Sequence, residues 1–340
     1  MRLIERDQSA RTSNAAPVVS VVVPTCNRPW LLERCLDALA GQKIRSGFFE
    51  IIVVDDRPSA GTRAVFRSKA ATVIRAGNEI RYVASSGPHG PAAARNRGWT
   101  AARAEIIAFT DDDTVPDALW LVNGLNALDD SLAAVCGRIV MPIPPLPTDY
   151  ERDASGLERA EFVTANCFCR KAILERVGGF DERFELAWRE DSDLQFRILE
   201  TGARIGIAPD ALVVHPVRPA RWGISLQQQK KVMFDVLLFK NHPRLYRTRI
   251  RKSPRWDYYA IVGLMLAAIA TGLSGVSPWL PAIFTGLWAL LTARFCMLRL
   301  RGTSRTAAHI AEMVVTSVLI PPLAVFWRLA GMLKFRVGFA

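Results

Sequence analysis

Three consecutive aspartates, Asp111, Asp112 and Asp113, directly follow Thr110 and an apolar run at residues 106–109. Adjacent carboxylates repel one another, and each raises the pKa of its neighbours unless a cation neutralises them. Carboxylate oxygens suit Mg²⁺ or Mn²⁺, and Mg²⁺ commonly keeps waters and substrate phosphates as its other ligands. The triplet alone is consistent with a metal site or with a solvated acidic loop, so the elements around it must decide.

Strand and helix patterns alternate along the first part of the chain. Such alternation predicts a mostly parallel sheet with helices on both faces. In these sheets, ligands bind beyond the carboxyl ends of the strands, and both Asp55-Asp56 and the aspartate triplet fall at predicted strand ends. The expected strands are residues 18–23, 50–54, 80–83, 106–109, 133–140, 162–169 and 211–215, and the expected helices begin near residues 31, 63, 92, 117, 171 and 194.

The first and last predicted strands place this α/β domain at residues 18–216, after a polar, flexible N-terminus at residues 1–17 that has no secretory signal. The six cysteines are scattered, and Cys167 and Cys169 form a C-x-C pair without a matching second pair. We therefore expect buried free thiols in a reducing compartment, with neither a zinc site nor a disulfide framework. The Pro-rich stretch at residues 142–149 is expected to be a mobile loop.

The net charge of +12 is concentrated in one segment, because residues 217–256 contain eleven Lys or Arg and one acid, Asp235. A polybasic segment beside a membrane span indicates attraction to anionic lipid. Nucleic-acid binding is the weaker alternative, since no nucleic-acid motif accompanies the charge. Within this juxtamembrane segment (residues 217–257), residues 225–240 predict an amphipathic helix, which lies on a membrane surface or packs against the catalytic domain.

The C-terminal part, residues 258–340, is expected to be a helical membrane region with two to three apolar helices. No charged residue occurs between Asp257 and Arg294, a stretch of 36 residues that is too long for one span of about 20. It predicts a hairpin of helices at residues 258–273 and 279–298, with both ends in the cytoplasm because both flanks are basic. Residues 313–327, which include Pro321 and Pro322, would span with a kink, re-enter or lie at the interface. A soluble helical dimerisation domain is the alternative for the whole region.

Several motifs in order resemble the inverting family-2 glycosyltransferases, which have the GT-A fold. The resemblance covers residues 18–216 and is specific for the family, while it carries little information on the substrate. The matching stretches are residues 21–28, 53–56, 90–98, 109–116, 178–181 and 190–191.

The resemblance implies a nucleotide-sugar site and a divalent metal, Mg²⁺ or Mn²⁺. Asp56 would contact the base, with uridine favoured because a carboxylate accepts from the uracil N–H. Arg95 would lie near the donor's base or diphosphate. In the family's D-x-D motif, Asp113 would bind the metal and Asp111 the ribose or metal, with Asp112 an additional acid. Pro24, Thr25 and Asn27 would shape the nucleotide pocket.

The reaction also needs a base for the acceptor hydroxyl, and the resemblance gives this role to Asp191, with Glu190 as its nearest competitor. The same two acids would also suit the first turn of a helix. His215 follows a strand and would be a third metal ligand or a structural histidine. Trp188 would line the acceptor or sugar site or serve packing alone.

These observations predict a glycosyltransferase in the inner membrane, with its catalytic domain facing the cytoplasm. It would move one sugar from a nucleotide-diphospho-sugar to a lipid-linked or cell-envelope glycan acceptor. Transfer of a single sugar is expected because the Q-x-x-R-W motif of processive relatives is missing near Gln227. The alternatives are a nucleotidyltransferase, which lacks a Gly-rich phosphate loop here, and a membrane-tethered nucleotide-sugar scaffold or sensor without turnover.

Overall fold

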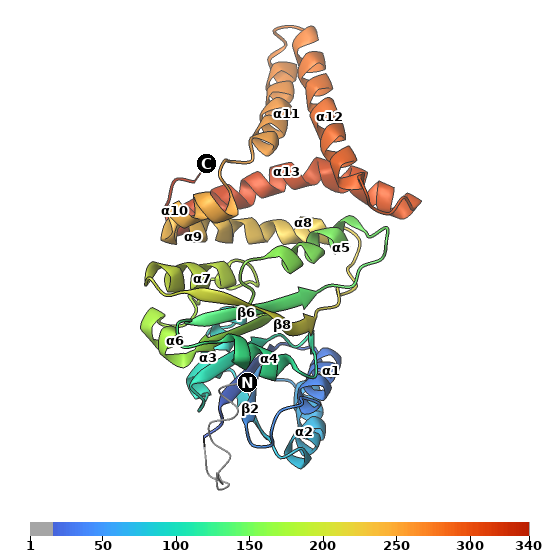
Figure 1. The fold of residues 1–340 in the computed structure, drawn as a ribbon. Helices are drawn as coiled ribbons and strands as arrows, with labels where there is room; N and C mark the ends of the chain where they lie inside the picture. The colour runs from blue at the N-terminus through green and yellow to red at the C-terminus, as the bar shows by residue number, and fades with distance from the viewer. Residues whose placement is uncertain (1–15, 340) are drawn as a thin grey trace. The chain divides into compact units, whose positions relative to one another are not determined.

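The computed structural model describes residues 16–339, and these form two compact units (Figure 1). The first unit runs to Pro142 and resumes at Gly156–Pro216, and the second contains Ile143–Ser155 and the chain from Val217 onward. The predicted flexible N-terminus, residues 1–17, lies almost wholly outside the described residues.

The first unit is built on an eight-stranded mixed sheet with the order β3-β2-β1-β4-β7-β6-β8-β5. Strands β3, β2, β1 and β4 are parallel, as expected, whereas β7 pairs antiparallel with both β4 and β6. The strands are β1 (Val19–Thr25), β2 (Phe49–Asp55), β3 (Glu79–Ala84), β4 (Ile106–Thr110), β5 (Val115–Pro116), β6 (Ala134–Val140), β7 (Asn166–Arg170) and β8 (Ile205–Val214).

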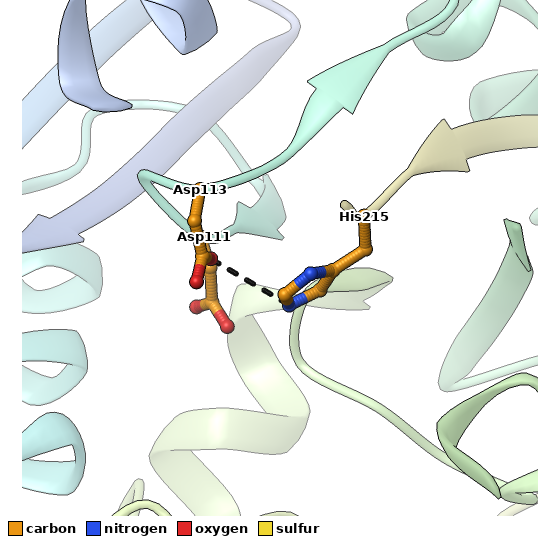
Figure 2. A group of neighbouring side chains, drawn as sticks. All are labelled: Asp111, Asp113 and His215. Atoms are coloured by element: carbon orange, nitrogen blue, oxygen red, sulfur yellow. Dashed lines mark ion pairs between the residues drawn. The ribbon is translucent and has the colours of Figure 1, made fainter. Parts of the chain in front are cut away.

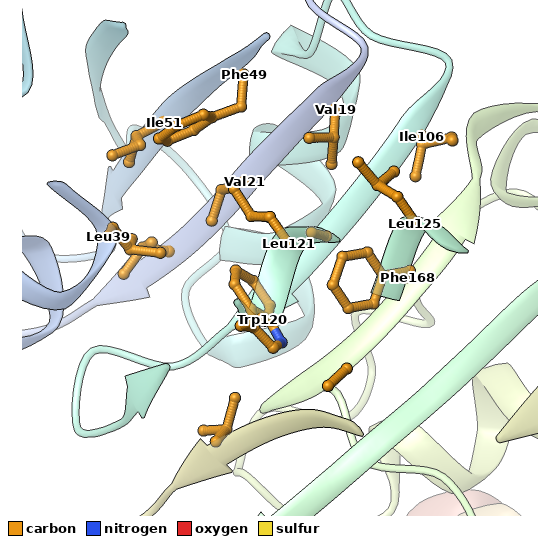
Figure 3. Close-up of a cluster of buried hydrophobic side chains, with 14 of the residues drawn as sticks. Val19, Val21, Leu39, Phe49, Ile51, Ile106, Trp120, Leu121, Leu125 and Phe168 are labelled. Atoms are coloured by element: carbon orange, nitrogen blue, oxygen red, sulfur yellow. The ribbon is translucent and has the colours of Figure 1, made fainter. Parts of the chain in front are cut away.

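The central strands are buried along their whole length, which explains their nearly continuous apolar sequences. Val21 of β1 and Phe49 of β2 pack in a core with Leu39 (Figure 3). Trp120 and Phe168 extend this core, with ring centroids 5.0 Å apart. The resulting rigid sheet is what positions the polar residues at its carboxyl edge.

Helices of the first unit follow the predicted alternation with shifted ends. The helix expected to begin near Arg63 starts at Ala60, because the Ser59 hydroxyl accepts from the Thr62 N–H and caps it. The strand expected at residues 162–169 begins only at Asn166, since residues 164–165 form a turn. The helices are α1 (Pro29–Ala40), α2 (Ala60–Arg75), α3 (Pro91–Ala101), α4 (Trp120–Ala127), α6 (Lys171–Val177) and α7 (Glu190–Glu200), and a 3-10 turn covers Ser155–Arg159.

The second unit is helical, and three of its described helices are long and apolar enough to cross a membrane: α11, α12 and α13. Helices α11 and α12 form the predicted hairpin, and α13 runs across its base beside α8 and α9 (Figure 1). Helix α13 covers Ala307–Phe335, so the third apolar segment is longer than the predicted residues 313–327. The helices are α5 (Asp149–Ala154), α8 (Ile224–Gln228), α9 (Val232–Asn241), α10 (Pro243–Leu245), α11 (Trp256–Ser274), α12 (Trp279–Leu300) and α13 (Ala307–Phe335), with a 3-10 turn at Gln229–Lys231 and a π turn at Tyr246–Ile250.

Candidate functional site

Two acids of the triplet and one histidine meet at the carboxyl edge of the sheet (Figure 2). Asp111 and Asp113 follow β4, and His215 follows β8, about a hundred residues later. One possible ligand atom from each lies within 4.8 Å of the others, and His215 Nε2 is 3.5 Å from Asp113 Oδ1. We call Asp111, Asp113 and His215 the acid–histidine cluster.

The middle acid, Asp112, is held by Thr25 and Arg28, and Arg28 also lies 3.7 Å from Asp113. The Asp112 side chain is fully buried, accepts a hydrogen bond from the Thr25 hydroxyl at 2.7 Å and pairs with Arg28 Nη2 at 3.0 Å. Burial raises the pKa of Asp112 to about 7, with Arg28 opposing the shift. Asp112 therefore ties the triplet to the end of β1, and the first and third acids form the cluster.

Arg95, near the start of α3, links the cluster to the acids of α7. Its guanidinium is 2.7 Å from Asp111, 3.1 Å from Glu190 and 4.0 Å from Asp191. Burial alone would lower the pKa of Arg95, but the three carboxylates raise it, so the side chain stays charged. For Asp111, burial raises the pKa, but Arg95 and then His215 lower it, and the net shift is downward.

Glu190 and Asp191 occupy the first turn of α7, as we expected if these two acids begin a helix. The Asp191 carboxylate is held at both oxygens by Thr164, whose hydroxyl donates at 2.6 Å and whose N–H donates at 3.2 Å. Burial raises the pKa of Asp191, with Arg95 and the Thr164 hydroxyl opposing it. Burial and the charge of Asp191 raise the pKa of Glu190 to about 8. Glu190 is therefore mostly protonated at neutral pH, in contrast to Asp111.

Two residues beside the site adopt left-handed backbone conformations that are uncommon outside glycine. Asn27, just after β1, has φ = 53°, and Arg189, just before Glu190, has φ = 76°. Such conformations cost about 1–3 kcal/mol and persist where the surroundings impose them, frequently at functional sites. Their positions mark the two loops that border the acids.

The remaining predicted residues surround the acid–histidine cluster without belonging to it. Asp56 follows β2, is nearly buried, accepts from the Gly90 N–H at 3.2 Å and lies 3.4 Å from His89 Nδ1. Pro24 and Thr25 are buried in β1, whereas Asn27 is exposed. Trp188 is 37% exposed, with the Arg189 guanidinium 4.6 Å from its ring centroid.

Two polar residues of this site were missed from the sequence. Arg28 lies within the matched motif at residues 21–28, yet its pairing with Asp112 depends on β1 and β4 being neighbours. Thr164 is 27 residues from Asp191 and in a stretch predicted to be strand, so no local pattern identifies it. The motif could have singled out Arg28, whereas Thr164 required the tertiary structure.

The acid–histidine cluster fits a divalent cation. Two carboxylates and an imidazole are chemically suitable donors, with the carboxylates favouring Mg²⁺ or Mn²⁺. The buried Nδ1 of His215 has no hydrogen-bond partner among the described residues. Asp111, Asp113 and His215 would hold the cation, which would neutralise negative charge on a bound phosphate group.

The mixed sheet and the acidic site at its carboxyl edge define a GT-A-type enzyme fold. Comparison with known families narrows this class. The glycosyl transferase family 2 model matches residues 20–181, and the glycosyl transferase family group 2 model matches residues 106–329, which is more than half of the chain. The chain belongs to the family-2 glycosyltransferases, and glycosyl transfer is the activity that this membership supports.

Individual relatives agree with this assignment. Glycosyltransferase AglE of Haloferax volcanii is 26% identical over 234 residues, covering 65% of this chain and 73% of that protein. Pre-mycofactocin glycosyltransferase of Mycobacterium tuberculosis is 31% identical over 217 residues, covering 59% of this chain and 43% of that protein. Mannosyltransferase PcManGT from Pyrobaculum calidifontis, solved with GDP-Man and Mn²⁺, has a TM-score of 0.60 at 22% identity and covers 96% of this chain and 92% of its own. The last likeness confirms the fold.

Proposed function

We propose that this protein transfers one sugar, with inversion, from a nucleotide-diphospho-sugar to a lipid-linked or cell-envelope glycan acceptor. The observation that carries the proposal is Arg95, which pairs with Asp111 of the acid–histidine cluster and lies 4.0 Å from Asp191. Such a transfer needs a site for the departing diphosphate and a base for the attacking hydroxyl. The acid–histidine cluster would serve the departing diphosphate, and Asp191 would serve as the base. The buried Arg95 guanidinium lies within reach of both.

In the proposed reaction, Asp191 accepts the proton of the acceptor hydroxyl while its oxygen attacks the anomeric carbon. The bond from this carbon to the diphosphate breaks, and the nucleoside diphosphate leaves with the bonding electrons. A base works from about 2.6–3.2 Å of the hydroxyl, and Thr164 orients the carboxylate for that approach. A divalent cation held by Asp111, Asp113 and His215 would stabilise the charge that develops on the leaving diphosphate.

The donor is proposed to lie along the carboxyl edge between β2 and β4, with Asp56, Pro24, Thr25 and Asn27 around the nucleotide. PcManGT binds GDP-Man, which supports a nucleotide-sugar donor for a chain of the same fold. Uridine remains a prediction from the carboxylate of Asp56. Trp188 is proposed to offer its partly exposed ring to the acceptor or the sugar.

We place the protein in the inner membrane as a multi-pass protein with the catalytic domain in the cytoplasm. Three apolar helices support membrane anchoring. The exposed basic residues Arg251 and Lys252 before α11 and Arg301 and Arg305 after α12 support a cytoplasmic position for both ends of the hairpin. A membrane-embedded enzyme has ready access to a lipid-linked acceptor.

The proposal is tested with the purified full chain in lipid nanodiscs, incubated with UDP- and GDP-sugars and Mn²⁺ or Mg²⁺. We expect one donor to release nucleoside diphosphate, release to stop with a chelator, and either cation to restore it. His215→Ala should raise the cation concentration needed for half-maximal rate. Release of pyrophosphate would indicate a nucleotidyltransferase, and donor binding without any turnover would indicate a scaffold or sensor; either result would overturn the proposal.

A further inference from the structure

Helix α13 has two unlike faces along its length. At 3.6 residues per turn, its buried positions cluster on one side of the helix. The opposite side is apolar and exposed, with exposed fractions from 41% to 81%. The buried positions include Met313, Thr316, Ile320, Ala324, Arg328, Gly331 and Phe335, and the exposed apolar face consists of Val315, Leu319, Phe326, Leu329 and Leu333.

The buried face of α13 is covered by α8 and α9 of the same unit (Figure 1), and Thr316 and Ser317 on this face also accept hydrogen bonds from Arg299 of α12. The contacts occur in the same order along α13 and along the α8–α9 segment, so the two run parallel for most of the length of α13. They also approach closely, because a Cβ added at Gly331 would lie 3.0 Å from the Met233 Cα. The contacts are Gly223 N–H to Glu312 Oε1 at 2.8 Å, Lys230 Nζ to the Trp327 ring centroid at 5.7 Å, and Lys240 Nζ to the Phe335 carbonyl at 2.7 Å.

This companion segment is incompatible with the hydrocarbon core of a bilayer. Residues 227–240 carry three glutamines, three lysines and Asp235, and they would enter the core together with α13 if α13 crossed it. The uncharged part of α13, residues 313–327, has 15 residues. It would extend only about 22 Å at 1.5 Å per residue, less than the roughly 30 Å of hydrocarbon. The shortness of the uncharged part and the packing therefore both argue against a third span, although the whole helix is long enough for one.

We propose that α13 lies in the plane of the membrane interface, with its exposed apolar face in the acyl region and its buried face on α8 and α9. The occupant of that face is the lipid bilayer because α13 is continuous with the α11–α12 hairpin, whose most apolar stretches are only 6% and 11% buried. Exposed Arg301 and Arg305 in the turn before α13 suit the headgroup layer. Of the helices that the structure describes, the hairpin alone crosses the membrane, so Phe335 lies on the same side as Arg255. This inference does not depend on the catalytic proposal.

Spin labels on the full chain in nanodiscs of phosphatidylcholine and phosphatidylglycerol test the orientation. Single cysteines replace Val315, Leu319, Phe326, Leu329 and Leu333 in turn, and Cys26, which is partly exposed while the other five cysteines are buried, is replaced by serine. The collision rates of each label with oxygen and with a water-soluble nickel complex measure its depth in the bilayer. We expect all five labels at a similar depth of about 5–10 Å.

Labels at Leu266, Ile269 and Leu273 of α11, which are also exposed and apolar, provide the matched control. Their depths should change steadily along α11 because that helix crosses the bilayer. A depth profile in α13 that peaks near Pro321 would overturn the proposal in favour of a third span. Full access of water to all five α13 labels would also overturn it, since the face would then serve a protein partner.

A second measurement needs no substitution in α13. Alkaline phosphatase, active only outside the cytoplasm, and green fluorescent protein, fluorescent only inside it, are fused after residue 340 of the full chain, with N-terminal fusions as the reference. We expect both termini to report the same side. Opposite sides would require an odd number of spans and would contradict an in-plane α13.

Discussion

At the scale of single residues, neighbours in the aspartate triplet have different environments. Asp112 faces Thr25 and Arg28, while Asp111 and Asp113 face His215. The two adjacent acids of α7 also differ, because Asp191 is held by Thr164 and Glu190 faces Arg95. Burial raises the pKa of both acids of α7, and their different contacts allow their roles to be separated by substitution.

Asp191→Asn should lower kcat for sugar transfer by about 10²–10⁴-fold, because the amide cannot accept the acceptor's proton, while the donor Kd changes little. Glu190→Gln should keep most of the activity, since Glu190, with a pKa of about 8, is already mostly neutral at pH 7 and a glutamine oxygen still accepts from Arg95. Steady-state rates and donor titrations measure both effects. Loss of transfer in the glutamine variant with full activity in the asparagine variant would assign the base to Glu190.

The pH profile tests how Thr164 acts on the base. Asp191 must be ionised to accept a proton, so kcat/KM should rise with pH through its raised pKa, above the ordinary 3.8. The Thr164 hydroxyl bond lowers this pKa, and a hydrogen bond to a charged group contributes about 1.5–3 kcal/mol. Thr164→Val should therefore shift the acid limb of the profile to higher pH.

Thr164→Ser is the matched control, since it keeps the hydroxyl and should restore the original position of the acid limb. If the threonine only fills space, valine would leave the position of that limb unchanged, and this result would contradict the proposed role of the hydroxyl.

At the scale of elements, α3 packs close to the sheet and thereby positions Arg95 beside Asp111. Gly98 makes this approach possible, because an added Cβ would lie 2.3 Å from Val22 Cγ1 and 3.1 Å from Val54 Cγ2. Both glycines of the motif at residues 90–98 are thus required by the structure. Gly90 has φ = 120°, and an added Cβ there would lie 2.7 Å from the Glu185 carbonyl oxygen. In this one of the six matching stretches, the glycines therefore meet the packing requirements of α3.

Gly98→Ala should destabilise the protein by about 1–3 kcal/mol, because overpacking pushes α3 away from β1 and β2. The same displacement should raise the donor KM through Arg95. Gly41→Ala is the control, since its φ is −85° and the new Cβ would make only ordinary 3.6 Å contacts. Thermal unfolding of the purified chain compares them, and equal stability of both variants would refute the close-packing explanation.

At the scale of the whole molecule, the second unit gathers segments that are distant in the chain around Arg299. This buried side chain of α12 pairs with Asp149 of α5 at 2.8 Å and donates to Thr316 and Ser317 of α13. The Pro-rich stretch at residues 142–149, expected to be a mobile loop, therefore ends at a buried ion pair. Removing one partner of such a pair leaves an uncompensated charge.

Asp149→Asn should lower the thermal stability of the full chain by on the order of 3 kcal/mol, somewhat less than a fully buried pair because the Asp149 side chain is 14% exposed. Asp130→Asn, which removes a fully exposed partner of Arg170, should have little effect. Unfolding monitored by intrinsic fluorescence in detergent measures both. Similar losses in the two variants would mean that burial does not set the strength of the Asp149–Arg299 pair.

Much of the fold could be predicted because its signals are local. Continuous β-branched runs indicated β1, β2 and β4, and the uncharged stretch between Asp257 and Arg294 indicated the α11–α12 hairpin. The antiparallel placement of β7 between β4 and β6 could not be predicted, since strand order depends on pairings between distant segments. The length of α13 was underestimated because the predicted segment was bounded by the charged residues Glu312 and Arg328, whereas the helix continues past both.

For the site, the sequence by itself determined the family, the acids available and the sheet edge at which they gather, because residue type and strand position are local properties. The tertiary structure decided which acids act together: it turned Asp112 inward, brought His215 to Asp111 and Asp113, and set Thr164 on Asp191. It also showed that α13 runs beside the charged α8–α9 segment. Those choices depend on contacts between residues far apart in the chain, and only folding brings such residues together.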